Sequence, residues 1–372
     1  MNASSLYMPI AVMAFVIAIV LLTAYLVPRL TRPDIYFAVT VPPDFRDSAE
    51  GRAILSRYRV EVILYSLIAL AIVLAAIWIP QPESQPFLGL GGLFLQGAGV
   101  FFAYYRARRR VQPHAVAPST VREAELAPRE VHLPGGWLVQ LVPFALLATT
   151  AVWLRSHWDQ IPNRFPIHWG MNGQANGWAT RTFAGVFAPV LMGTALCALM
   201  GFMAYAMLRW SRLIRASGQA GANERRFRHL VVSILVATEY FLAIEFTWVG
   251  LLPLSHNLTG PPGLVPFLLF SLVFTGGILI LLIRLGQGGT RLSGAATVTA
   301  AAELAPVGDR TADRYWKLGL FYINRDDPAL FVEKRFGIGY TLNFGHIGTW
   351  VFIGALIAIT VLIIFLVPSQ HH

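Results

Sequence analysis

Long apolar runs alternate with shorter polar segments along the whole chain. A helix needs roughly 20 apolar residues to cross a bilayer, because each residue advances it by about 1.5 Å. The hydrophobic pattern therefore predicts an all-α polytopic membrane protein with about eight transmembrane helices and a small cytoplasmic β-rich lobe. The expected spans cover residues 8–28, 60–79, 87–105, 137–154, 183–208, 230–252, 264–283 and 347–367.

The composition agrees with this class. Hydrophobic residues make up 56% of the chain and charged residues 13%, too few to keep a globule of 372 residues soluble in water. A single cysteine, Cys197, excludes an internal disulfide framework and a multi-cysteine metal site. The net charge of +10 suits nucleic acid or an anionic membrane, but the basic residues flank the apolar runs. We therefore expect membrane lipids as partners and no nucleic acid.

The basic residues also predict an orientation, because cytoplasmic loops retain Lys and Arg. With both termini outside, 26 of the 29 basic residues lie in cytoplasmic connections, and only Arg155, Arg164 and Arg181 lie outside. The run RARRR at 106–110 is expected to contact anionic lipid. We expect a multi-pass protein of the bacterial cytoplasmic (inner) membrane with both termini extracytoplasmic. The first apolar run lacks a preceding basic residue and is expected to be an uncleaved helix.

These patterns divide the chain into membrane and cytoplasmic parts. In chain order we expect a first span (1–28), a cytoplasmic segment (29–59), a hairpin of two spans (60–106), a cytoplasmic loop (107–136), the fourth and fifth spans around an extracytoplasmic loop at 155–182 (137–208), the sixth and seventh spans (230–283), a flexible cytoplasmic linker (284–310), a cytoplasmic aromatic domain (311–346) and the last span (347–367).

Four short stretches of the cytoplasmic parts have the β-branched and aromatic composition of strands. They read IYFAVTV, GLFYIN, ALFVE and IGYTLNF. Two strands alone are marginal in water, so we expect the four to form one small sheet against the inner membrane face. An aromatic interfacial segment without a sheet is the alternative. Residues 286–309 are mostly Gly, Ala, Thr and Ser and are expected to be flexible.

Two polar motifs predict helix starts in the cytoplasmic parts. Asp47 or Ser48 is a candidate cap for a helix that runs into the second span. Thr120 with Glu123 three residues later has the pattern of a capping box in a short helix.

The stretch IPNRFPIHWGMNGQANGWATR, residues 161–181, is the most distinctive polar segment outside the expected spans. Pro162 and Pro166 make its entry stiff and extended, and its glycines permit turns of positive φ. Its tryptophans suit the headgroup level of the membrane. His168 has too few potential ligands nearby for a metal site, so we expect no metal and no cofactor. A structural loop braced on the membrane and a recognition surface for an extracellular peptide or lipid remain open.

A pattern of Pro, His, aromatic, Asn and Gly positions runs through this stretch, and it resembles the signature of a bacterial domain of unknown function, number 1648, found in SdpI-like integral membrane proteins. Two positions depart from the family, which often has an acidic residue and a lysine where this chain has Asn176 and Arg181. Ile161 and Phe165 match the signature, as do the candidates for ligand recognition, which are Pro162, Pro166, His168, Trp169, Asn172, Gly173, Gly177 and Trp178. Some relatives give immunity to a secreted peptide toxin and signal to a repressor.

The aromatic domain likewise resembles a second uncharacterised domain, number 5808, that accompanies the first. The matching positions are Trp316, Lys317, Gly319, Phe321, Tyr322, Asn324, Asp327, Pro328, Phe331, Val332, Lys334, Arg335, Gly337, Gly339, Thr341 and Asn343. The candidate functional residues of the lobe are Trp316, Lys317, Asn324, Asp327, Lys334, Arg335, Thr341 and Asn343.

Two acidic residues, Glu239 and Glu245, lie inside the sixth expected span. Six residues along a helix correspond to about 240° of rotation, so the two carboxyl groups should face different neighbours. Ionisable groups at membrane depth are costly, and they are functional candidates for that reason. A proton- or cation-responsive pocket is one interpretation; two protonated carboxyls hydrogen-bonded to neighbouring helices are the other.

The chain lacks the sequence motifs of zinc proteases, phosphate-binding loops and serine hydrolases, so we expect no enzyme. The expected function is a non-enzymatic receptor, immunity or signalling role, in which the loop at 157–181 senses an extracellular peptide or lipid. The lobe would pass its state to a cytoplasmic regulator or another membrane subunit. The alternatives are a transporter or proton-coupled permease that uses Glu239 and Glu245, and a structural subunit of a larger membrane assembly. His371 and His372 are assigned to no site.

Overall fold

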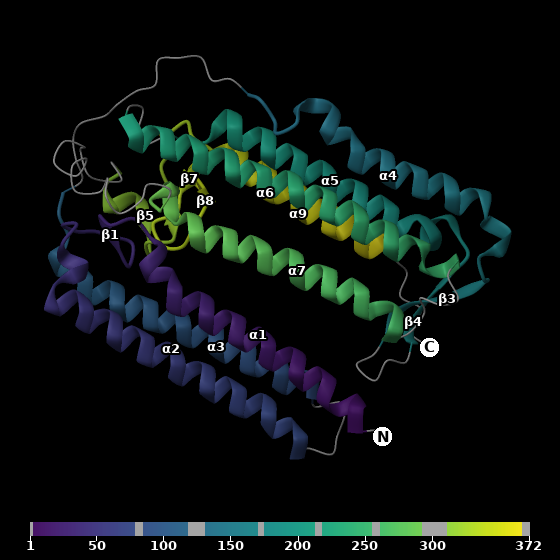
Figure 1. The fold of residues 1–372 in the computed structure, drawn as a ribbon, viewed down its shortest axis with the longest axis horizontal. Coiled ribbons are helices and arrows are strands. Elements are labelled where there is room, and N and C mark those ends of the chain that lie inside the picture. The colour runs from purple at the N-terminus through teal and green to yellow at the C-terminus, as the bar shows by residue number, and fades with distance from the viewer. Residues whose placement is uncertain are drawn as a thin grey trace.

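The computed structural model describes residues 3–78, 85–117, 131–169, 175–212, 218–254, 261–291 and 311–366. The described part holds eight long helices that run lengthwise through the molecule (Figure 1). They are α1 (Ala3–Leu30), α2 (Ala49–Ala75), α3 (Gln85–Val111), α4 (Gly136–Ser156), α5 (Phe183–Trp210), α6 (Gly218–Leu251), α7 (Pro261–Leu285) and α9 (Ile347–Leu366).

Each expected span falls on one of these helices, which confirms the all-α polytopic class. Seven helices, α1 to α7, are long and apolar enough to cross a membrane, and α9 adds a shorter apolar stretch at Ile347–Val361. Large apolar side chains are exposed along them; Phe94 is 79% exposed and Val152 69%. Such surface is costly in water and suits contact with lipid.

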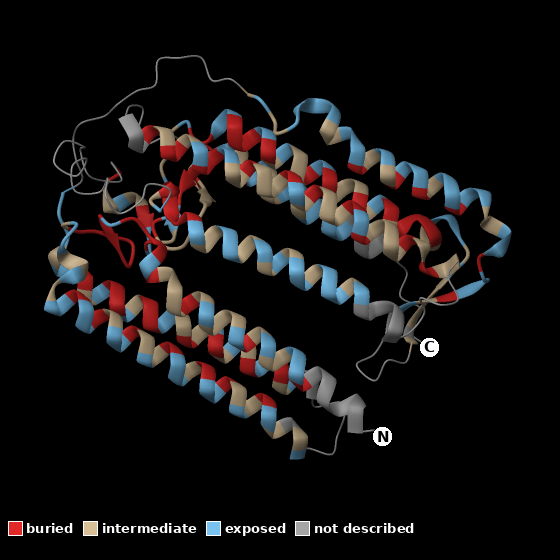
Figure 2. Cartoon of the chain, viewed as in Figure 1, coloured by how far each residue is buried: buried red, intermediate tan, exposed pale blue. Residues whose placement is uncertain are grey.

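The helices form two groups. Helices α1, α2 and α3 pack together, as do α4, α5 and α6, and α9 packs on α5. Helix α7 contacts α6, where Phe241 stacks on Phe274 with ring centroids 4.2 Å apart. No residue from Pro266 to Arg284 of α7 is buried, and most of that helix is coloured as exposed or intermediate in Figure 2.

The two ends of the helix array differ. The start of α1, the end of α9 and the hairpin of β3 (Arg164–Trp169) with β4 (Ala175–Thr180) lie at one end (Figure 1). The opposite end holds three smaller hairpins. Their strands are β1 (Ile35–Tyr36), β2 (Val39–Thr40), β5 (Trp316–Lys317), β6 (Phe321–Tyr322), β7 (Phe331–Glu333) and β8 (Tyr340–Leu342).

The expectation of one sheet from four strands was wrong. Among the described residues of these four stretches, the strands pair as β1–β2, β5–β6 and β7–β8, with isolated bridges from Tyr322 to Asn343 and from Ser211 to Phe331. The stretch IYFAVTV is not one strand, because it reverses at Phe37 and Ala38, whose φ values are 45° and 62°. A two-residue turn with positive φ at both positions gives a tight hairpin, which leaves no strand to extend a shared sheet.

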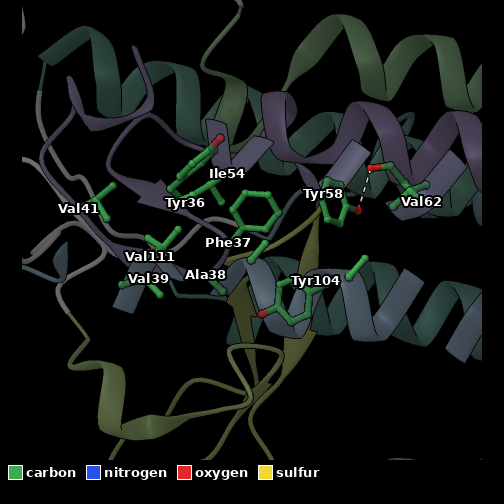
Figure 3. Packing of buried hydrophobic residues seen from close by; sticks show 13 residues of the cluster. Tyr36, Phe37, Ala38, Val39, Val41, Ile54, Tyr58, Val62, Tyr104 and Val111 are labelled. Carbon is green, nitrogen blue, oxygen red and sulfur yellow. Dashed lines mark hydrogen bonds between the residues drawn. The ribbon is translucent and has the colours of Figure 1, made fainter. Parts of the chain in front are cut away.

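This turn forms the centre of the α1–α3 core (Figure 3). The Phe37 side chain is completely buried, 5.0 Å from the Tyr58 ring and 5.8 Å from the Phe336 ring between centroids. Burying such a side chain stabilises the fold by about 1.5–3 kcal/mol. Because Phe336 comes from the C-terminal lobe, the same contact joins that lobe to the first helix group.

We use "the cap" for residues 311–346, which include β5 to β8. The start of the expected flexible linker is fixed to the cap, contrary to the prediction: the turn Gln287–Gly289 is buried. The Gln287 side chain donates to the Gly339 carbonyl at 2.9 Å and accepts from the Gly339 amide at 2.6 Å. The remainder of the linker, 292–310, lies outside the described residues.

The two helix-start predictions have different outcomes. The Ser48 hydroxyl accepts from the Gly51 amide at 3.0 Å, so Ser48 caps α2 as expected. The capping box of Thr120 and Glu123 lies outside the described residues.

Gly319 provides a test of how tightly the cap packs on α3. It has a φ of +75°, and a Cβ atom there would lie 2.5 Å from the Tyr104 hydroxyl oxygen and 2.6 Å from the Ala38 Cβ atom. We expect Gly319→Ala to destabilise the protein by about 2–5 kcal/mol, since backbone strain and overpacking add. Thermal unfolding of the detergent-solubilised protein measures the change.

Gly339→Ala is the matched control, because Gly339 also has a positive φ (+97°) but nothing within 4 Å of the added atom. It should lose only the strain contribution. Equal melting temperatures for the two variants would show that the close approach at Gly319 does not exist.

Candidate functional site

The hairpin β3–β4 carries the signature stretch predicted to recognise a ligand. Its strands pair antiparallel, with Pro166 opposite Trp178 and His168 opposite Gly177, and the register shifts on both sides of His168. Such a shift marks a bulge, which bends a strand and redirects a side chain. The stiff, extended entry expected from the prolines is thus the first strand of a hairpin.

Apolar packing fixes the base of the hairpin to the helices. Ile161 and Phe165 are buried in a cluster with Leu154 of α4 and Phe187 of α5. The Trp158 ring stacks on Phe187 with centroids 6.2 Å apart. The hairpin is therefore a rigid extension of α4 and α5.

Arg181 is a residue of this site that the sequence reasoning missed. Its Nη1 atom donates to the carbonyls of Trp158, Asp159 and Ile161 at 3.4, 3.3 and 3.1 Å. The guanidinium thus ties the exit of β4 to the turn after α4. The available signal was the basic residue at this position of the family pattern.

The recognition candidates divide into described and undescribed residues. Trp178 is half-buried, and the Arg164 guanidinium lies over its ring at 5.0 Å from the centroid. Pro162 is exposed at the entry to β3. The side chains of His168 and Trp169, together with Asn172 and Gly173, lie outside the described residues.

Asn343 organises the cap at the opposite end. Its side-chain nitrogen donates to the carbonyls of Asn324, Asp327 and Ala329 at 2.8, 3.1 and 3.2 Å. Its side-chain oxygen accepts from the amides of Asn324 and Gly345 at 3.1 and 3.0 Å. Five hydrogen bonds satisfy a completely buried amide, so its role is to hold the loops of the cap together.

Asp327 joins the cap to α5. Its carboxylate accepts from the Tyr322 hydroxyl at 2.9 Å and from the Arg212 guanidinium at 2.8 Å. Burial raises the pKa of Tyr322 to about 12, so the phenol stays neutral and donates. The backbone continues this contact, because the Leu330 amide donates to the Trp210 carbonyl and the Arg212 amide to the Phe331 carbonyl, both at 2.9 Å.

Arg335 joins the cap to the first helix group. The side chain is fully buried and donates to Asp313 and to the carbonyls of Thr311 and Ala38. Its guanidinium also lies over the Trp316 ring, 5.2 Å from the centroid. A buried cation needs such partners, because unpaired burial is strongly unfavourable.

A second ionic contact to the first helix group was not predicted. Arg32, directly after α1, pairs with Asp34 at 3.3 Å and with Glu333 of β7 at 3.4 Å, and all three residues are buried. Nothing in the local sequence signals this pair, because Arg32 and Glu333 are 301 positions apart.

The remaining cap candidates do not enter this network. Lys317 is exposed on β5, and Thr341 lies half-buried on β8 opposite Val332. Lys334 is exposed, and its amide donates to the Gly339 carbonyl at 3.0 Å. The structure thus brings together Trp316, Asn324, Asp327, Arg335 and Asn343 of the predicted set.

The two acidic residues of α6 face different helices, as the helical rotation predicts. Glu239 lies against α5, where a Cβ atom added at Gly201 would be 3.6 Å from its Oε2 atom. Glu245 accepts a hydrogen bond from Ser271 of α7 at 3.1 Å. The two carboxyl groups therefore do not form one pocket.

Comparison with known proteins gives two family matches. Residues 144–193 match a Domain of unknown function (DUF1648), which covers the end of α4, the hairpin and the first part of α5. Residues 325–350 match a Family of unknown function (DUF5808), so Trp316, Lys317 and Asn324 precede the matched stretch. No curated protein and no solved structure matches the chain. The chain therefore carries both of these domains, the first around the hairpin and the second from the middle of the cap to the start of α9.

Proposed function

We propose that this protein is a non-enzymatic receptor of the bacterial cytoplasmic membrane, with an immunity or signalling role towards an extracellular peptide or lipid. The observation that carries the proposal is the course of α5. The helix begins at Phe183, three residues after β4 ends, and finishes at Trp210, whose carbonyl accepts from the cap. One rigid element therefore joins the hairpin to the cap.

The distribution of charge supports an orientation. The connections that the sequence predicts to be cytoplasmic carry 26 of the 29 basic residues, and their described parts lie at the cap end; Arg155, Arg164 and Arg181 lie in or beside the hairpin. Positive charge is retained on the cytoplasmic side, so we place the cap inside and the hairpin with both termini outside. In this orientation the hairpin meets extracellular ligands and the cap meets a cytoplasmic regulator or another membrane subunit.

The chemistry of the two ends supports a role in binding and relay. The side chains of Asn343, Asp327 and Arg335 bond to groups of the cap, and those of Asp327 and Arg335 also bond to Arg212 and Ala38 outside it. The hairpin offers a tryptophan with a cation over its ring, and aromatic residues of this kind are favoured in recognition surfaces. The resemblance to SdpI-like proteins favours a secreted peptide as the ligand.

Transport by Glu239 and Glu245 draws less support. A shared ion path requires the two carboxyl groups to line one cavity, whereas one faces α5 and the other bonds to α7.

The orientation predicts which side of the membrane each end faces. We expect Ile167→Cys on β3 to react with a membrane-impermeant maleimide in intact cells. Phe321→Cys on β6 should react only after the membrane is permeabilised, and the two side chains are similarly exposed, at 37% and 44%. The natural Cys197 is completely buried and provides the background. The reverse labelling pattern would contradict the orientation.

The recognition role predicts that the hairpin aromatics are needed for protection but not for folding. His168, Trp169 and Trp178 are changed together to Ala in a strain that otherwise lacks the gene. The tolerated dose of a culture supernatant from the source organism should fall to that of the deletion strain, with unchanged membrane abundance. Trp137→Ala, an exposed tryptophan at the start of α4, should keep full protection. Full protection by the triple variant would refute hairpin recognition.

If α5 passes a change at the hairpin on to the cap, Asp327 should couple the cap to α5. Removing the charge with Asp327→Asn weakens a hydrogen bond worth about 1.5–3 kcal/mol, so amide exchange in this region should accelerate about 10–100-fold. Hydrogen-exchange mass spectrometry of peptides that contain Arg212 and Leu330 measures the change. Asp326→Asn is the matched control, because Asp326 is exposed. Unchanged exchange in Asp327→Asn would show that this ion pair does not hold the two elements together.

A further inference from the structure

The second helix group is built from layers in which a glycine of one helix faces side chains of the other two. A Cβ atom added at Gly193 would lie 2.6 Å from Phe246 of α6 and 3.2 Å from Leu147 of α4. One layer nearer the hairpin, Gly250 of α6 faces Val190 and Thr150 in the same way.

A polar layer lies closer to the cap, two helical turns along α4 and α6 from the layer of Gly193. Glu239 is seven residues before Phe246, and Gln140 is seven residues before Leu147, so each lies two helical turns along its helix on the same face. The Tyr240 hydroxyl donates to the Val139 carbonyl at 2.6 Å, which confirms that α4 and α6 meet at this level. Gly201 supplies the small residue from α5.

The polar groups of this layer lack partners. Glu239 is 0% exposed, and neither of its carboxyl oxygens has a hydrogen-bond partner among the described residues. Both side-chain polar atoms of Gln140 are likewise shielded from solvent and without a partner in the described part of the chain. An unpaired buried carboxylate is strongly unfavourable, so the site requires a positive species.

The surrounding helices offer no such charge near Glu239. The basic residues of α4 and α5 are Arg155 and Arg209, each in the last turn of its helix, and α9 carries no ionisable side chain. The ionisable neighbours are Tyr240, which bonds to α4, and Cys197, whose sulfur donates to the Glu239 carbonyl at 3.4 Å. Neither group is cationic.

We propose that Glu239 and Gln140 form a proton-binding site inside the α4–α5–α6 core. The carboxyl group holds a proton while the three helices are packed as in this structure, and the Gln140 side-chain oxygen, at the same level of the core, is the acceptor for the hydrogen bond of that proton. Separation of α5 from α6 admits water and releases the proton. The site is distinct from the hairpin and the cap, so it stands whatever ligand the hairpin binds.

Infrared difference spectroscopy of the full-length protein in lipid vesicles at neutral pH tests the site. When the spectrum of Glu239→Gln is subtracted from that of the wild type, the difference should show the carbonyl band of a protonated carboxyl group. The same subtraction with Glu61→Gln should show carboxylate bands. Glu61 is a suitable reference because it pairs with Arg106 at 2.9 Å. Carboxylate bands in the Glu239 difference spectrum would overturn the proposal.

Two further measurements distinguish the proton from other occupants. Gln140→Leu should shift the protonated band of Glu239, because it removes the acceptor; an unchanged band would remove Gln140 from the site. Replacing sodium and potassium with a large organic cation should leave the spectrum unchanged. A carboxylate signal that becomes protonated only after this exchange would assign the site to a metal cation and overturn the proton proposal.

Discussion

The arrangement of the two helix groups depends on the hydrogen bonds that the buried guanidinium of Arg335 makes. The guanidinium bonds to the Ala38 carbonyl in the turn that fills the α1–α3 core, and to Asp313 and Thr311 of the cap. A buried cation is tolerated only when its partners hold a fixed geometry, so this contact fixes the turn against the cap. Arg212 and Asp327 make the corresponding contact with α5. The cap therefore joins two groups of helices through hydrogen bonds and ion pairs, together with the apolar contacts of Phe336 on one side and of Leu330 and Phe331 on the other.

Local sequence patterns predicted the membrane helices, because whether a segment lies in lipid or in water depends on its own composition. Each apolar run became a helix because a chain in lipid must satisfy its backbone hydrogen bonds within itself. The cap was harder to predict, because its geometry depends on contacts between distant segments. The reversal at Phe37 has no glycine or asparagine to announce it, and Gln287 lies in a stretch whose composition resembles a linker. Arg335 and Asn343 were found through a family resemblance, which identified the residues without showing what they contact.

The hairpin and the cap are both fixed to α5 by apolar packing. Packed cores deform little and move between discrete arrangements. Since apolar contacts fix the hairpin base to α4 and α5, a ligand that tilts the hairpin must move these helices with it. At the other end, α5 meets the cap through backbone hydrogen bonds, through the ion pair of Arg212 and Asp327, and through a buried apolar cluster in which Leu330 and Phe331 pack with Met207. A movement of α5 is therefore passed to the cap through packed side chains as well as through hydrogen bonds.

The hydrogen bonding of the buried polar side chains indicates which regions keep one arrangement and which can adopt another. The amide of Asn343 has five partners, and a network satisfied to this degree specifies one arrangement. Glu239 and Gln140 have no partners among the described residues, although apolar side chains at both positions would pack without this cost. Stability alone therefore does not explain the polar side chains of Glu239 and Gln140. They are explained if the protein adopts two arrangements: the packed one of this structure, and an opened one in which water reaches the carboxyl group. The layer of Glu239, Gln140 and Gly201 is then the part of the second helix group that opens, while the cap holds the helix ends.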